Sequence, residues 1–125
     1  MKNILIIGTV DTKSDEIDFM RECIKNLECN PVIMDVSVLG DPPIKVDYSK
    51  HDVAEHANMT NKEIISLGNE NDAMIASAKG AKSLTLKLCK EKKIDGTIVL
   101  GGTMGTDLAL DVFSELPLGF PKCLV

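Results

Sequence analysis

The sequence predicts an α/β fold in which helices cover both faces of a parallel sheet of the Rossmann or flavodoxin-like type, with strand order 2-1-3-4. Apolar runs that do not alternate are typical of strands buried on both faces. Such runs occur at residues 3–8, 31–36 and 96–100. The segments between them carry apolar residues at helical spacing. Strands and helices in this alternation form right-handed crossovers, which place successive strands in one parallel sheet.

The composition fits a single domain with a small-molecule ligand. A chain of 125 residues with 44% hydrophobic residues can bury one core. Aromatic residues make up only 3% of the chain, which argues against a surface that stacks nucleic-acid bases. The net charge is −5 and no basic stripe is present, so a phosphate backbone is not an expected partner.

The chain shows no sign of membrane insertion or of a disulfide framework. No window approaches 18 uninterrupted apolar residues, and the N-terminus lacks the pattern of a signal peptide. The cysteines lack C-x-x-C spacing, so we expect reduced thiols in a cytoplasmic protein and no metal site. These cysteines are Cys23, Cys29, Cys89 and Cys123.

The first half of the chain reads as strand, helix and strand. A helix is expected after residues 3–8, with Thr12 or Ser14 as its cap and acidic residues in its first turn. Its predicted apolar stripe consists of Ile17, Met20, Ile24 and Leu27, widened by Phe19 and Cys23. Residues 31–36 then form the second strand.

The middle of the chain is less regular. A Gly-Asp-Pro-Pro loop occupies residues 40–43, and Ser49 with Asp52 resembles a capping box that opens a short helix through residue 57. Asn61 is a candidate cap for a second short helix through residue 67.

A long helix is expected from residue 71 to about residue 92. Its buried side is predicted to consist of Met74, Ala78, Ala81, Leu84 and Leu88. The third strand is followed by a helix at about 106–114 and a short strand at 122–125. Because the sequence stops inside a strand, we expect residues 1–125 to be the N-terminal part of a longer domain.

The first strand-to-helix turn, residues 8–13 (GTVDTK), has the composition of an anion site. Backbone N–H groups at a helix N-terminus attract an anion, and the dipole contributes about 0.3–1 kcal/mol. Lys13 adds a positive charge, and Thr9 and Thr12 add hydroxyls. Asp11 could hold a hydrated Mg²⁺ or accept from a ribose hydroxyl. An ordinary capped helix start explains the same residues equally well.

The second turn, residues 101–106 (GGTMGT), points more strongly to a ligand. Its three glycines allow close backbone approach, and such a loop can direct successive N–H groups at one anion. A turn that only needs flexibility explains one glycine but not three. Neither turn matches the P-loop or the dinucleotide-binding pattern, which argues against both of those classes.

The predicted strand order places both turns beside one crevice. In open parallel sheets, ligands bind beyond the carboxyl ends of the strands where the strand order reverses. Asp35, at the end of the second strand, could reach a ribose there, although a turn-forming role fits equally well. His51 and His56 are interpreted as surface residues, and no serine or threonine lies in a nucleophile motif.

Several segments, in order along the whole chain, resemble an uncharacterised protein family of bacteria and fungi that includes the tomato mosaic virus resistance protein. They are GTVDTK at 8–13, MDV at 34–36, GAK at 80–82, IDGTIVLGGTMGT at 94–106 and LPLGFPK at 116–122. Met104 stands where a small residue is common in this family, and Ser14 stands where a glycine is usual.

The resemblance implies an N-terminal, Rossmann-like, ATP-binding domain, and the carboxylate of Asp11 makes Mg²⁺ an optional companion of ATP. The positions implied for nucleotide contact are Gly8, Thr9, Asp11, Thr12, Lys13, Gly101, Gly102, Thr103, Gly105 and Thr106. The resemblance implies no reaction, so whether the protein is an enzyme stays open.

We therefore expect nucleotide binding through the two turns, with two alternatives. One is an enzyme that acts on a small phosphorylated or carboxylated metabolite on the same fold. The other is a non-catalytic interaction module that uses the irregular segment 37–69. The exposed edges of the sheet also make a homo-oligomer an expectation.

Overall fold

In the computed structural model, a four-stranded parallel sheet forms the centre of the chain. The structure describes residues 2–37, 40–100, 112–114, 116–117 and 119–125. The strands lie in the order β2-β1-β3-β4 and pair in parallel. Their bounds are β1 Asn3–Gly8, β2 Asn30–Asp35, β3 Gly96–Val99 and β4 Lys122–Leu124. The predicted fold class and strand order are confirmed.

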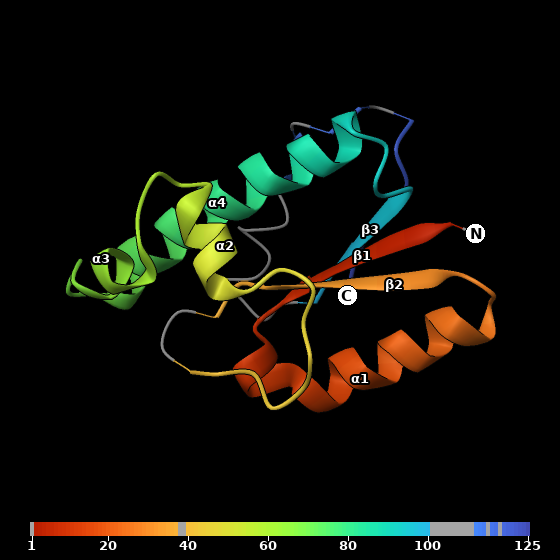
Figure 1. The fold of residues 1–125 in the computed structure, drawn as a ribbon, viewed down its shortest axis with the longest axis horizontal. Coiled ribbons are helices and arrows are strands. Elements are labelled where there is room, and N and C mark those ends of the chain that lie inside the picture. Colours follow the sequence, from red (N-terminus) through yellow and green to blue (C-terminus); the bar gives the residue numbers. More distant parts are fainter. Residues whose placement is uncertain (1, 38–39, 101–111, 115, 118) are drawn as a thin grey trace.

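The two long helices lie on opposite faces of this sheet, with the two short helices beside the start of α4 (Figure 1). The bounds are α1 Val10–Asn26, α2 Lys50–Glu55, α3 Asn61–Ile65 and α4 Glu70–Lys90. Of the predicted helix at 106–114, only residues 112–114 are described, and they are helical. None of the helices in the described part of the chain combines the length and hydropathy needed to span a membrane.

Side chains on successive residues of β1 point to opposite faces and divide the core in two. Leu5 and Ile7 belong to a buried cluster with Leu84 of α4. Ile6 belongs to a second cluster with Ile17 of α1. This double coverage explains why the strands read as continuous apolar runs in the sequence.

The segment before α2 covers the outer edge of β2. The backbone N–H of Asp35 donates to the carbonyl of Tyr48 at 2.9 Å, and Tyr48 N donates to the carbonyl of Ile33 at 3.0 Å. The next residue, Ser49, forms the predicted capping box with Asp52 at the start of α2. The edge pairing and the cap together fix α2 near the carboxyl end of β2.

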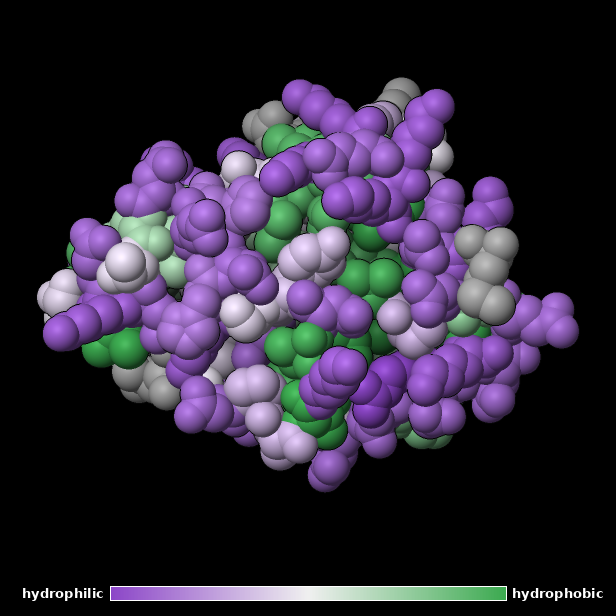
Figure 2. Space-filling view, in the orientation of Figure 1, coloured by the Kyte–Doolittle hydropathy of each residue, from purple (hydrophilic) through white to green (hydrophobic). Residues whose placement is uncertain are grey.

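Apolar side chains gather in the middle of the face drawn in Figure 2, between hydrophilic surfaces that cover the two long helices. Ile44 and Val46, from the segment between β2 and α2, are partly buried against the cluster on the α1 side of the sheet. The irregular segment between β2 and α2 therefore contributes to the core.

The first helix begins earlier than predicted. It starts at Val10, with Thr9 as N-cap, and neither Thr12 nor Ser14 is the cap. Lys13 interrupts it with a non-helical φ of −121° and ψ of 28°. Residues 10–13 therefore form a separate turn that leads into the main helix.

The predicted apolar stripe of this helix is too wide. Ile17 and Ile24 are buried, but Phe19 is 70% exposed and Leu27 is 76% exposed. Phe19 follows Ile17 by two residues, which is about 200° around the helix axis, so it points away from the sheet. Leu27 lies at the C-cap, beyond the last turn that packs on the sheet.

The caps of the later helices differ slightly from the prediction. Thr60, rather than Asn61, caps α3, and its hydroxyl and the Glu63 carboxylate form a second capping box. Asn69 caps α4 through a bond from the backbone N–H of Asp72 to its side-chain oxygen at 2.8 Å. These helices start where polar side chains satisfy their first backbone N–H groups.

Candidate functional site

The first predicted ligand turn begins next to Leu100, the residue that precedes the second turn, at the carboxyl edge of the sheet. Leu100, directly before the second turn, donates its backbone N–H to the carbonyl of Ile7 at 2.9 Å. The carbonyl of Leu100 would lie 3.5 Å from a Cβ atom placed on Gly8. The pairing of β1 with β3 thus brings Leu100, the last described residue before the second turn, to the first turn, as the predicted strand order required.

The predicted residues of the second turn lie outside the described residues. They are Gly101, Gly102, Thr103, Gly105 and Thr106. Their assignment to a ligand therefore stays a prediction.

Gly8 has a packing reason to be glycine. A Cβ atom at this position would lie 3.0 Å from Cδ1 of Ile17. A side chain here would require the end of Ile17 to shift by a few tenths of an ångström, so the close packing of β1 and α1 favours glycine without any ligand.

Two backbone N–H groups at the start of α1 donate to side chains that follow β2. Val10 N donates to Oδ1 of Asp35 at 3.2 Å, and Asp11 N donates to Oγ of Ser37 at 3.2 Å. The expectation of open amides at this helix start is therefore wrong. The chain after β2 satisfies donors that a helix N-terminus otherwise leaves unpaired.

The next two amides are satisfied within the turn itself. Thr12 N and Lys13 N both donate to the carbonyl of Thr9, at 3.2 and 2.9 Å. A phosphate near this turn would therefore meet side chains rather than free amides.

Asp35 anchors the end of β2 to the start of α1. Its side chain is fully buried, and Oδ1 accepts from Val10 N and, at 2.9 Å, from Ser37 N. Its second oxygen, Oδ2, is buried without a hydrogen-bond partner among the described residues. The predicted contact of Asp35 with a ribose stays untested, since Oδ1 already serves the protein and Oδ2 is buried.

Ser37 links the two aspartates, and sequence reasoning missed it. Its Oγ lies 2.8 Å from Oδ1 of Asp11 and 2.5 Å from Oδ1 of Asp35. The only sequence signal is the position of Ser37, a polar residue two positions after Asp35 at the end of a buried strand.

Lys50 of α2 binds residues 40 and 41, which lie against the first turn, and the sequence did not predict this contact either. Its Nζ donates to the carbonyl of Gly40 and to Oδ1 of Asp41, both at 3.0 Å, and its side chain is only 10% exposed. A Cβ atom at Gly40 would lie 2.4 Å from Oδ2 of Asp11. The absence of a side chain at Gly40 therefore lets the backbone rest against Asp11.

Three polar side chains of the first turn, those of Thr9, Thr12 and Lys13, are partly or fully exposed. Lys13 is half-buried and forms no ion pair with any described residue. The hydroxyls of Thr9 and Thr12 lie 2.8 Å apart, and Thr12 is exposed. One lysine and two threonines thus belong to the same turn as Asp11, whose half-exposed carboxylate is linked through Ser37 to the buried Asp35.

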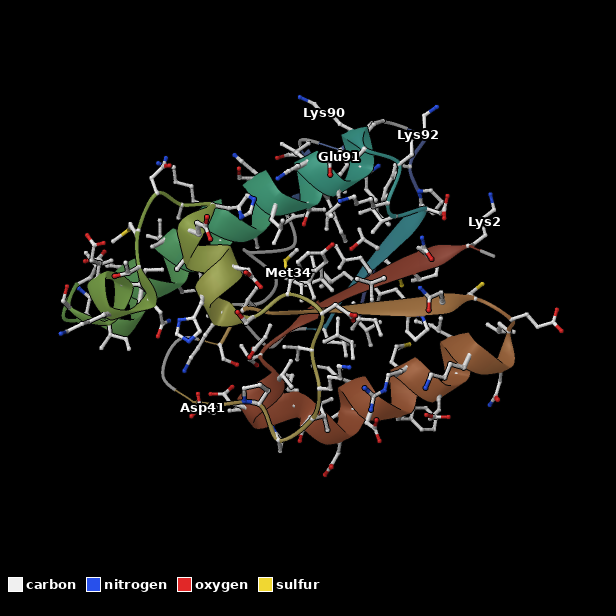
Figure 3. All side chains as sticks on the ribbon, viewed as in Figure 1. Lys2, Met34, Asp41, Lys90, Glu91 and Lys92 are labelled. Carbon is white, nitrogen blue, oxygen red and sulfur yellow. The ribbon has the colours of Figure 1, made fainter. Side chains whose placement is uncertain are left out.

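The lysine-rich end of the molecule is remote from this site. Figure 3 shows Asp41 near the start of α1, whereas Lys2, Lys90 and Lys92 lie at the opposite end of the molecule. The positive charge that would favour a phosphate at the predicted site must therefore come from Lys13 and its neighbours.

The histidines and cysteines do not contribute to the site. His51 is exposed, and Nδ1 of His56 lies 2.9 Å from the carbonyl of Asp52 in its own helix. All four cysteines are free. Over the described ranges, no group of three or more histidine, cysteine, aspartate or glutamate side chains could hold a metal ion.

The whole sequence from residue 2 to residue 125 matches the family model described as the N-terminal domain of the uncharacterised protein family UPF0261. The chain belongs to this family. Its membership agrees with the resemblance seen in the sequence and does not itself assign a ligand or a reaction.

Three relatives show the range of similarity. A UPF0261 protein of Brucella suis biovar 1 (strain 1330) is 52% identical over 98% of this chain, and one of Clostridium tetani (strain Massachusetts / E88) is 32% identical over 99%. The ToMV resistance protein Tm-1(GCR237) of Solanum lycopersicum is 30% identical over 98% of this chain. The matched regions are 29%, 31% and 18% of these proteins, so the chain spans less than a third of each.

Proposed function

We propose that the carboxyl edge of β1 and β3 binds a nucleotide, with ATP as the preferred ligand. The observation that supports this proposal is the contact between Leu100 and the end of β1, because Leu100 directly precedes the glycine-rich turn in sequence and Gly8 begins the first turn. Parallel sheets bind ligands at such points, where strand order reverses.

Different groups of the two turns are assigned to the phosphates of the nucleotide. Among the described residues, the ammonium group of Lys13 has no carboxylate partner, and we assign it to a phosphate. The hydroxyls of Thr9 and Thr12, which lie 2.8 Å apart in the same turn, add hydrogen-bond donors. Because the amides of the first turn are occupied, backbone contacts to phosphate are assigned to the glycine-rich turn at 101–106.

The two aspartates of the site have different roles in this proposal. Asp11 is half-exposed and is the carboxylate best placed to meet a ribose hydroxyl or a phosphate-bound cation. Asp35 holds the turn in place by accepting hydrogen bonds from the backbone N–H groups of Val10 and Ser37. Nucleotide binding by this chain requires no change in these buried bonds.

Replacing Lys13 by alanine is expected to weaken ATP binding at least about tenfold. A hydrogen bond between charged groups contributes about 1.5–3 kcal/mol, and 1.4 kcal/mol corresponds to a factor of ten in affinity. Isothermal titration calorimetry with ATP, ADP, GTP and a sugar phosphate, in the presence of EDTA, measures this effect and the ligand preference together.

Lys62→Ala is the matched control, because Lys62 is exposed on α3. The control should bind ATP like the unmodified chain. Equal affinity of the Lys13 and Lys62 variants would reject the assigned role of Lys13. Preference for a sugar phosphate would favour a metabolite enzyme, and no binding of any of these ligands would favour an interaction module.

A further inference from the structure

We propose that Asp11, Ser37 and Asp35 form a binding site for a small divalent cation of the Mg²⁺ type. This cation site does not depend on nucleotide binding, because its three proposed ligands are side chains of the protein and none is a phosphate. It rests on an imbalance of hydrogen-bond donors and acceptors, and on a buried oxygen that the described residues leave without a partner.

The hydroxyl of Ser37 cannot satisfy both neighbouring carboxylates. Its Oγ lies 2.8 Å from Oδ1 of Asp11 and 2.5 Å from Oδ1 of Asp35, and it also accepts from Asp11 N. A serine hydroxyl carries a single hydrogen. It therefore donates to one carboxylate and leaves the other at contact distance with no hydrogen between the two oxygens.

A separate observation points to a missing positive partner. Asp35 is fully buried, and both amides that reach it donate to Oδ1. Oδ2 is buried and has no hydrogen-bond partner in the described part of the chain. A buried carboxylate oxygen without a partner is costly. This free acceptor is bonded to the same carbon atom as Oδ1, the oxygen that contacts Ser37 Oγ.

The described cations of the protein do not neutralise the pair. Neither Asp11 nor Asp35 takes part in an ion pair with a described residue. Lys50, which approaches the same segment, donates to the carbonyl of Gly40 and to Asp41. The N-terminus of α1 supplies only about half of an elementary charge.

The ligand set selects a hard cation. Asp11, Ser37 and Asp35 offer oxygen atoms only, which suit Mg²⁺, Mn²⁺ or Ca²⁺, whereas zinc prefers imidazole and thiolate. Mg²⁺ commonly uses one or two carboxylates and keeps several waters. A site with two carboxylates and one hydroxyl therefore suits Mg²⁺, although it contains only two acidic side chains.

Titration with Mn²⁺, followed by electron paramagnetic resonance without nucleotide, tests the site. The unmodified chain should bind one Mn²⁺, and Mg²⁺ should displace it. Asp35→Asn and Asp11→Asn should each weaken Mn²⁺ binding at least tenfold, because each removes a negatively charged ligand. Asp72→Asn, an exposed aspartate on α4, is the control and should leave the affinity unchanged.

The proposal is overturned if the unmodified chain binds no Mn²⁺ saturably, or if binding survives in Asp11→Asn. Should Asp35→Asn fail to fold, as judged by far-ultraviolet circular dichroism, the half-exposed Asp11→Asn variant decides the question. Because Mn²⁺ is titrated without nucleotide and ATP is titrated in EDTA, failure of one proposal does not imply failure of the other.

Discussion

Asp35→Ala is expected to lower the free energy of unfolding by about 3 kcal/mol. The substitution removes the acceptor for the backbone N–H groups of Val10 and Ser37 and leaves these donors without a partner in a buried place. Each hydrogen bond to a charged group contributes about 1.5–3 kcal/mol. Urea denaturation followed by far-ultraviolet circular dichroism measures the loss.

Two further variants make this experiment specific. Asp35→Asn keeps one side-chain oxygen as an acceptor and should be intermediate in stability. Asp41→Ala removes a carboxylate that is 91% exposed, and it should cost less than about 1 kcal/mol. An Asp35→Ala protein as stable as Asp41→Ala would contradict the role of Asp35 as the anchor between β2 and α1.

Gly80→Ala is the second substitution with a large expected effect. A Cβ atom at Gly80 of α4 would lie 2.0 Å from the carbonyl oxygen of Val53 in α2. Both helices must then separate, because the obstructing atom belongs to the backbone. We expect a loss of about 3 kcal/mol, even though alanine favours a helix over glycine by about 1 kcal/mol.

Ser83→Ala is the matched control for Gly80→Ala. Ser83 lies three residues later in α4 and is exposed, so alanine there should leave the stability unchanged or raise it slightly. Urea midpoints of both variants, compared at equal m-values, give the difference. A Gly80→Ala chain more stable than the unmodified chain would show that α2 does not pack as closely on α4 as described.

The first three strands and their order could be predicted because these strands are largely buried between the helices on the two faces of the sheet. Residues 3–8 form β1 as expected, and the third strand lies beside β1 on the side away from β2. The capping box of Ser49 and Asp52 also gave the start of α2 correctly, since that signal is local. Local chemistry and continuous burial are visible in a single sequence.

The buried polar bonds of the site could not be predicted in the same way. Ser37 contacts Asp11, which lies 26 positions earlier in the sequence. Lys50 donates to the carbonyl of Gly40, which lies 10 positions earlier. Nothing in the spacing of these residues announces that they meet. For the same reason, the sequence suggested open amides at the start of α1, whereas long-range contacts from Asp35 and Ser37 occupy two of them.

The extent of the apolar stripe on α1 was overestimated for a geometric reason. Phe19 fits a broad helical pattern, but a helix that packs on a sheet buries only a narrow face, and Phe19 is 70% exposed. Hydrophobicity alone did not separate Phe19 from Ile17, which is buried. The position of each residue around the helix axis decides which of them packs on the sheet.

A titration of the ¹⁵N-labelled chain with ATP, followed by two-dimensional NMR, tests the central claim most directly. We expect the largest shifts to cluster at residues 8–13 and 101–106, with smaller shifts at 35–37 and none at the lysine-rich end of α4. Shifts confined to the region around Lys90 and Lys92, or no shifts at all at saturating ATP, would contradict nucleotide binding at the carboxyl edge of the sheet.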